Sequence, residues 1–175
     1  VDQLLRATID SGVVTFNASF FYDIKYSGVK SLRIDIPSSL TEQVRVTSKS
    51  VRREAMQPQP EDVAENYTAW SLAAENELRG STRFDLVWEQ KIDELGIGKS
   101  RDISIPRLIP QAVNLATGQI VIGKAESIDV QPTTDVRGLI PIDPHNDLRH
   151  PAAIENAAMA FTFVDDWSLV VRATR

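Results

Sequence analysis

The fold is decided by residues 12–47, which read GVVTFNASFFYDIKYSGVKSLRIDIPSSLTEQVRVT. From Val14 to Tyr26 every even position is apolar, and every odd position is polar except Phe21. The even positions hold Val14, Phe16, Ala18, Phe20, Tyr22, Ile24 and Tyr26. Because successive side chains of a strand point to opposite faces, this alternation predicts a long strand with one buried face.

The alternation resumes after Ser27-Gly28, a pair that predicts a turn. Apolar and polar residues alternate again over 31–36 until Pro37, which ends the strand because proline cannot donate a hydrogen bond to a neighbouring strand. A third strand begins at 44–46, where Arg45 separates two valines. This part of the chain is therefore predicted to be an antiparallel meander.

Further short strands are expected throughout the rest of the chain. They fall at 4–9, 48–56, 84–88, 103–105, 119–122, 128–130, 159–163 and 167–171. The last two would form a hairpin around Asp165-Asp166. Four prolines predict a long loop over 132–153, and one or two helical turns could follow within 152–158.

Residues 61–80 allow two interpretations. A helical stripe is formed by Val63, Tyr67, Trp70, Ala74 and Leu78. The alternative is a hairpin in which 67–72 pairs with 84–88, and we favour it because the neighbouring segments are all strands. The whole pattern predicts an all-β chain, a two-sheet antiparallel β-sandwich with long loops and at most one or two short helices. It would form a single domain over residues 1–175, with an internal joint at 96–100, Gly96-Ile97-Gly98-Lys99-Ser100.

Composition excludes several classes of function. The net charge is −5 and the basic residues are scattered, so nucleic acid is not an expected partner. No apolar run approaches the roughly 20 residues that cross a bilayer, so this segment is not expected to insert into a membrane. The absence of cysteine excludes disulfides, thiol catalysis and cysteine-ligated clusters. Because the chain begins at Val1 rather than Met, we expect a mature product or a segment of a longer protein.

Residues 32–46 resemble part of the N-terminal β domain of the M1 aminopeptidases. In that domain, too, an alternating strand ends at a proline and a second strand follows. The resemblance covers residues 14–54, and the alternation on which it depends is common to many sandwiches. The zinc signature H-E-x-x-H of that family does not occur in this sequence, and we assign no family.

Candidate binding residues are concentrated in one loop. Asp143, His145, Asp147 and His150 combine carboxylate and imidazole groups, the ligand types that suit zinc. The spacing matches no established metal motif, and Asp and Pro are common in turns, so we favour a solvated turn-forming loop without a metal. Trp70 is a candidate sugar-stacking residue, whereas Trp88 and Trp167 continue apolar strand faces and are predicted to lie in the core.

No catalytic constellation and no cofactor motif is present. We therefore expect a non-catalytic structural or binding module of a bacterial surface or envelope protein, extracellular or periplasmic. Its partners would be other domains of the same polypeptide or other surface proteins. The alternatives are a carbohydrate-binding module that uses exposed aromatic residues and a metal-dependent hydrolase built on residues 143–150.

Overall fold

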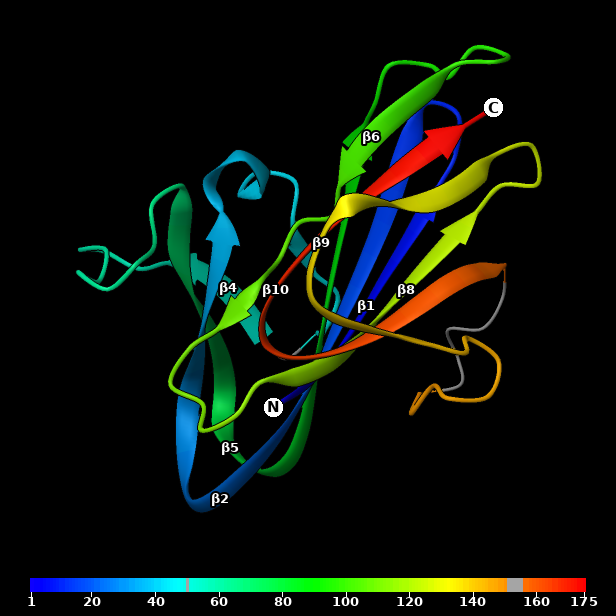
Figure 1. Ribbon diagram of the computed structural model, residues 1–175. Helices are drawn as coiled ribbons and strands as arrows, with labels where there is room; N and C mark the ends of the chain where they lie inside the picture. Colours follow the sequence, from blue (N-terminus) through cyan, green and yellow to red (C-terminus); the bar gives the residue numbers. More distant parts are fainter. Residues whose placement is uncertain (50, 151–155) are drawn as a thin grey trace.

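The computed structural model describes residues 1–49, 51–150 and 156–175, and its fold is almost entirely β (Figure 1). The strands are β1 (Asp2–Ile9), β2 (Val13–Pro37), β3 (Arg45–Val46), β4 (Val51–Ala55), β5 (Tyr67–Lys91), β6 (Ser100–Ser104), β7 (Ile109–Pro110), β8 (Thr117–Lys124), β9 (Asp129–Ile142) and β10 (Ala157–Thr174). A single 3-10 turn, η1 (Ser38–Leu40), is the one helical element in the described part of the chain. The all-β prediction is confirmed.

All ten strands belong to one sheet. The main path runs β3-β5-β2-β1-β8-β10-β6, while β4 pairs with β5, β7 with β2 and β9 with β10. The pairing is antiparallel except between β1 and β8, which run parallel, with Leu5 opposite Ile120. The sheet is therefore mixed and open, and a sandwich of two separate antiparallel sheets is not confirmed.

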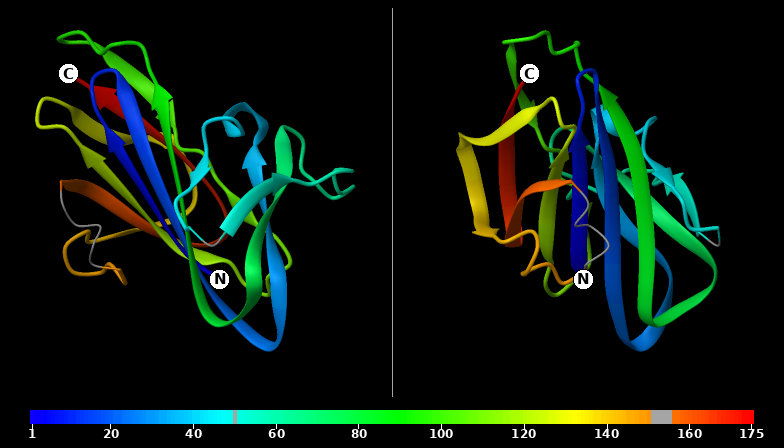
Figure 2. Two further views of the ribbon diagram at one scale, coloured as in Figure 1. Left: turned by 180° about the vertical axis from the view of Figure 1, so that it is seen from behind. Right: turned by 90° about the vertical axis from the view of Figure 1, so that its right-hand side faces the viewer.

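Two 25-residue strands, β2 and β5, form a ribbon that bends through a U at the lower left of Figure 1. They pair from Val13 opposite Lys91 to Pro37 opposite Tyr67, and the register shifts between Ile24 and Ser31 mark the bend. Figure 2 shows this ribbon from behind and from the side: its two arms meet at the bend and stand apart above it. The sheet thereby folds over its own core.

The prediction of a turn at Ser27-Gly28 is wrong, because both residues lie within β2. Both interpretations of residues 61–80 are also wrong, since 67–91 is one strand. Residues 67–72 pair with the end of β2 rather than with 84–88. The length of β2 explains this, because it offers hydrogen-bonding partners to both halves of β5.

The predicted hairpin around Asp165-Asp166 is replaced by one bent strand, β10, whose halves do not pair with each other. The bend is at Asp165, which has a φ of 58°. The first half of β10 pairs with β8, the second with β6, and β9 accompanies both.

The predicted proline loop begins only after Ile142, because β9 includes Pro132 and Pro141. Prolines are tolerated there since, among the described strands, β9 pairs only with β10 and forms an edge of the sheet. Of the helical turn expected within 152–158, residues 152–155 lie outside the described residues, whereas 157–158 belong to β10.

The core confirms the predicted alternation of β2 from Val14 to Tyr22, whose even members are all buried. The two last even members differ: Ile24 is half-buried, and Tyr26, which lies at the bend, is fully exposed. Trp88 and Trp167 are buried as predicted, and the Trp88 ring stacks on Phe16 with 4.9 Å between centroids. On the opposite face of the sheet, a small cluster of Leu4, Val121 and Ala160 is covered in part by Phe21 and Leu148.

The segment 96–100 connects β5 to β6, and neighbouring backbone bonds tie it to the sheet: Leu95 donates to Ser11 at 2.6 Å and Gly98 donates to Arg175 at 2.6 Å. The division of the chain into domains stays a prediction.

In the described part of the chain, no helix has the length and hydropathy needed to cross a membrane.

Candidate functional site

The loop at 143–150 forms a closed turn around Asp143. The Asp143 carboxylate accepts the backbone N–H of His145 at 2.8 Å and the side-chain amide of Asn146 at 2.7 Å. In return, the backbone N–H of Asp143 donates to the Asp147 carboxylate at 3.0 Å. The His145 N–H, and then the Asn146 amide, lower the pKa of Asp143 below its ordinary value. The carboxylates of Asp143 and Asp147 thus both accept hydrogen bonds that stabilise the turn.

His150 turns away from that loop and toward the sheet. Its Nε2 lies 3.2 Å from a carboxylate oxygen of Asp2, and its ring stacks on Phe21 with 4.0 Å between centroids. His145 is exposed. Among the described residues, no three His, Asp or Glu side chains are placed to hold a metal ion. Asp143, His145 and Asp147 thus share one turn, and His150 belongs to a different contact.

Gln119 of β8 anchors this loop and was not foreseen from the sequence. Its buried side chain donates to the carbonyl oxygen of Asp147 at 2.9 Å and accepts the backbone N–H of Arg149 at 2.8 Å. The amide therefore satisfies two backbone groups of an irregular segment, as a neighbouring strand would.

Trp70 of β5 is not an open platform. It is half-buried, and the guanidinium of Arg53 lies 4.0 Å from the centre of its ring. Burial lowers the pKa of Arg53 from its ordinary value. One face of the indole is therefore covered by a cation–π contact, which leaves less of the ring for stacking on a sugar.

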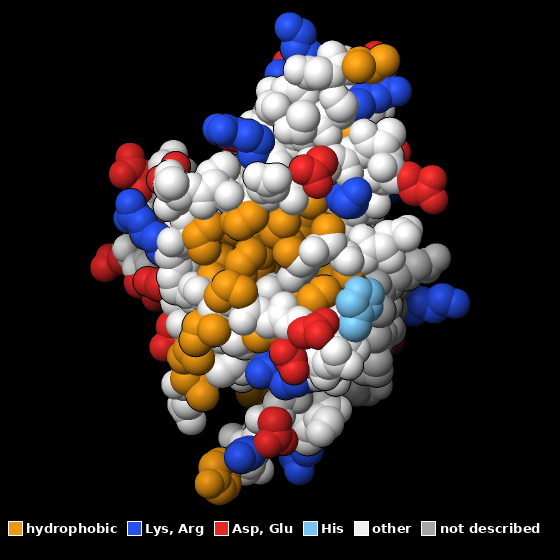
Figure 3. Space-filling view, turned by 45° about the vertical axis from the view of Figure 1, so that its right-hand side comes forward, with side chains coloured by type: hydrophobic (Ala, Val, Ile, Leu, Met, Phe, Trp, Pro, Cys, Tyr) orange, Lys and Arg blue, Asp and Glu red, His pale blue; other side chains and the backbone are white. Residues whose placement is uncertain are grey.

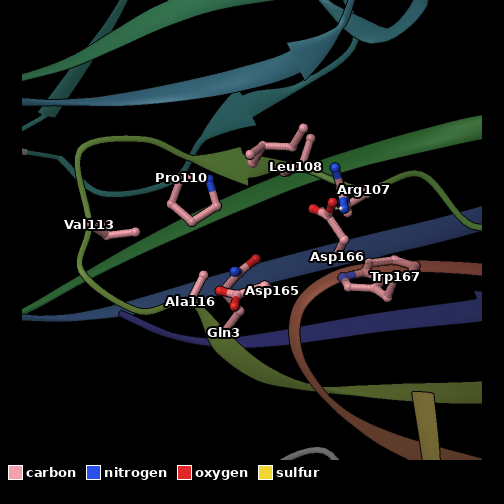
Figure 4. Close-up of a pocket in the computed structure, with 10 residues that line it drawn as sticks. Gln3, Arg107, Leu108, Pro110, Val113, Ala116, Asp165, Asp166 and Trp167 are labelled. Carbon is pink, nitrogen blue, oxygen red and sulfur yellow. Dashed lines mark hydrogen bonds and ion pairs between the residues drawn. The ribbon is translucent and has the colours of Figure 1, made fainter. Parts of the chain in front are cut away.

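A hollow that the sequence did not predict lies at the bend of β10 (Figure 4). Its volume is about 180 Å³, and three separate parts of the chain line it. β1 contributes Gln3, the segment between β6 and β7 contributes Arg107 and Leu108, and the bend contributes Asp166 and Trp167.

A second hollow of about 520 Å³ adjoins the first and shares Arg107 and Trp167 with it. Polar groups without charge surround it: Ser39, Tyr67, Gln90, Ser104 and Ser168. Its apolar lining includes Leu40, Ile105 and Leu169. We call the two hollows together the Arg107 site.

Three charged side chains line the Arg107 site: Arg107, which both hollows share, and Asp165 and Asp166, which line the smaller hollow. A terminal nitrogen of Arg107 donates to the Asp166 carboxylate at 2.6 Å. The Arg107 side chain is only 23% exposed, whereas that of Asp166 is 93% exposed. Gln3 is buried, and it lines the smaller hollow. An arginine and amide side chains thus lie beside apolar residues in the Arg107 site.

Little in the sequence marks these residues as a site. Asp166 was interpreted as part of a hairpin turn, Trp167 as a core residue, and Arg107 stands between two prolines without a recognisable motif. The site depends on the β10 bend, which brings residues near positions 3, 107 and 166 together.

The outer surface carries apolar side chains as well. Figure 3 shows a group of them in the middle of one face, with charged side chains around it. The exposed large apolar residues include Leu115, Ile140 and Val164. Ile140 is paired with Thr162, two residues before Val164 on β10, so Ile140 and Val164 share one face of the sheet.

No protein-family model and no curated protein matches this sequence. Among solved structures, native leukotriene A4 hydrolase from Saccharomyces cerevisiae is similar, with a TM-score of 0.37 and 11% identity. The yeast enzyme in complex with bestatin gives a TM-score of 0.36 and 11% identity. Each match covers 99% of this chain and 28% of the other, so this chain spans little more than a quarter of their length. At these values the likeness carries no argument about function.

Proposed function

We propose that the chain is a non-catalytic binding module of a larger protein and that its ligand binds in the Arg107 site. The observation that supports this most is a half-buried arginine shared by two adjoining hollows, which both apolar and polar side chains line. The larger hollow, at about 520 Å³, falls within the range of roughly 300–1,000 Å³ typical of ligand pockets. Its lining combines apolar side chains with polar groups that could orient a ligand.

Binding is favoured over catalysis by the residues that surround the hydroxyl groups. A serine becomes a nucleophile when an adjacent base removes its proton. The described residues that line the second hollow include Ser39, Ser104 and Ser168 but no His, Lys, Asp or Glu. These hydroxyls can donate and accept hydrogen bonds, and nothing beside them in that lining would activate them.

The wider context of the proposal comes from the sequence. We propose a bacterial surface or envelope protein whose other domains are partners, and the exposed Leu115, Ile140 and Val164 support contact with such a domain. The folded-over sheet would serve as the two layers of a sandwich around the core. Neither the carbohydrate platform at Trp70 nor the metal site at 143–150 gains support from the contacts of those residues.

A fragment screen followed by NMR tests the proposal. In ¹⁵N-labelled protein, bound fragments should shift the indole N–H of Trp167 and the side-chain amides of Gln3 and Gln90. Arg107→Gln should weaken these shifts. Arg172→Gln is the matched control, because the exposed side chain of Arg172 pairs with that of Asp102 outside both hollows.

Both variants should keep a denaturant midpoint close to that of the parent, since neither arginine is part of the hydrophobic core. If no fragment shifts these three resonances, or if fragments shift them equally in Arg107→Gln, the Arg107 site is not a binding site and the proposal is wrong.

A further inference from the structure

The charge of the larger hollow indicates the class of its ligand. Arg107 is the one charged side chain among the described residues that line it. The serine hydroxyls and the Gln90 amide can donate hydrogen bonds, whereas the Tyr67 hydroxyl already donates to the carbonyl oxygen of Arg107 at 3.2 Å. A cation surrounded by neutral donors favours a negatively charged group.

The guanidinium has donors left for such a group. It carries five N–H groups, and the Asp166 carboxylate is its partner among the described residues. The remaining donors can form the paired hydrogen bonds with which arginine binds a carboxylate or a phosphate. Because the Arg107 side chain is only 23% exposed, these bonds would be screened less by water than bonds at an open surface.

Asp166 limits this capacity. Its carboxylate takes one side of Arg107, and it lines the smaller hollow but not the larger one. At 93% exposure it loses little solvation if it is displaced. An incoming anion would therefore compete with Asp166 for Arg107 and would also be repelled by it.

We infer that the ligand of the Arg107 site is an organic anion whose carboxylate or phosphate group binds Arg107, while its apolar part lies against Trp167, Leu40 and Leu169. Asp166 reduces the affinity for this anion. The inference rests on the proposed function, because it names the ligand class of the same site.

Matched probes test the charge of the ligand. Benzoate and benzamide have nearly the same shape, and only benzoate is charged. Titrations followed at the Trp167 indole N–H should show benzoate binding at least about tenfold more tightly, because hydrogen bonds to charged groups are the stronger ones. Phenyl phosphate, titrated alongside, tells whether carboxylate or phosphate is preferred.

Three variants test the residues. Arg107→Gln should abolish the preference for benzoate, and Arg172→Gln should retain it. Asp166→Asn should raise the benzoate affinity several-fold and leave that of benzamide unchanged. The denaturant midpoint of each variant shows that it is folded.

Equal affinity of benzoate and benzamide at Trp167 would overturn the inference and leave the proposed function standing. The same holds if neutral fragments shift Trp167 and benzoate does not. A lower benzoate affinity in Asp166→Asn would overturn the role given to Asp166. If no compound shifts Trp167, the proposed function fails together with the inference.

Discussion

Gly138 of β9 lies so close to the backbone of Asp166 in β10 that a side chain on Gly138 would overlap the Asp166 carbonyl oxygen. The φ of Gly138 is +66°, a left-handed conformation that other residues rarely adopt. Asp166 and Trp167 both line the Arg107 site and both follow the β10 bend. The backbones of β9 and β10 therefore lie in close contact next to the bend and the Arg107 site.

Gly138→Ala should destabilise the protein by well over 1 kcal/mol. The left-handed conformation alone costs roughly 1–2 kcal/mol for a residue with a Cβ, and the overlap with the Asp166 backbone adds to it. Gly80→Ala is a matched control, because Gly80 has a φ of +64° and open space around it. The denaturant midpoint at constant slope measures both losses. Equal losses would show that β10 moves away easily and that the approach is not constrained.

Phe20→Ala should cost far more stability than Phe21→Ala. Phe20 is 1% exposed in the main core, and truncating such a residue typically costs about 3–5 kcal/mol. Phe21 is half-buried on the other face, where its ring stacks on His150. We expect about 1–2 kcal/mol for Phe21→Ala, because an aromatic pair contributes beyond its buried area.

A double-mutant cycle of Phe21→Ala with His150→Ala isolates that stack. The coupling should be about 0.5–1.5 kcal/mol. A coupling near zero would mean that the stacked rings contribute nothing to stability.

For the two single variants, a larger loss of stability in Phe21→Ala than in Phe20→Ala would contradict the register of β2.

Gln119→Met should release the 143–150 loop from β8. The substitution keeps the approximate size of the side chain, but it removes the bonds to the Asp147 carbonyl and the Arg149 N–H. A buried backbone group without a partner costs about 1–3 kcal/mol. Hydrogen exchange at the Arg149 amide should accelerate, whereas Gln131→Met, on an exposed part of β9, should leave it unchanged. Unaltered exchange in Gln119→Met would show that other contacts fix the loop.

The Asp143 carboxyl should titrate below its ordinary pKa of 3.8, because the His145 N–H and the Asn146 amide stabilise its charged form. A pKa that is lower in the folded than in the unfolded state stabilises the fold above the unfolded pKa. That stabilisation is lost as the pH falls through the folded value. NMR titration of the carboxyl carbon measures the pKa, and Asn146→Ala should raise it part of the way. A titration midpoint at or above 3.8 would contradict the closed turn.

The sequence predicted the fold better than it predicted the residues of the proposed site and of the 143–150 loop. The bonds of Asp143 fit the turn-forming loop that was favoured for 143–150, and the local sequence suffices for that, since both partners lie within three residues. Gln119 and Arg107 could not be found in the same way. Their partners lie 28 and 59 residues away, and neither residue belongs to a periodic pattern.

The sequence by itself determined the strand character of the chain and the buried face of β2, because alternation every two residues is a local property that burial of one face imposes. It also determined that Trp88 and Trp167 lie in the core. Only the tertiary structure decided that β2 and β5 run on through Ser27-Gly28 and residues 73–80, that β1 pairs in parallel with β8, and that β10 bends instead of forming a hairpin. These features depend on which distant strand supplies the backbone hydrogen bonds. A turn signal such as Gly or Asp-Asp permits a reversal of the chain, but the available partner strand decides whether it occurs.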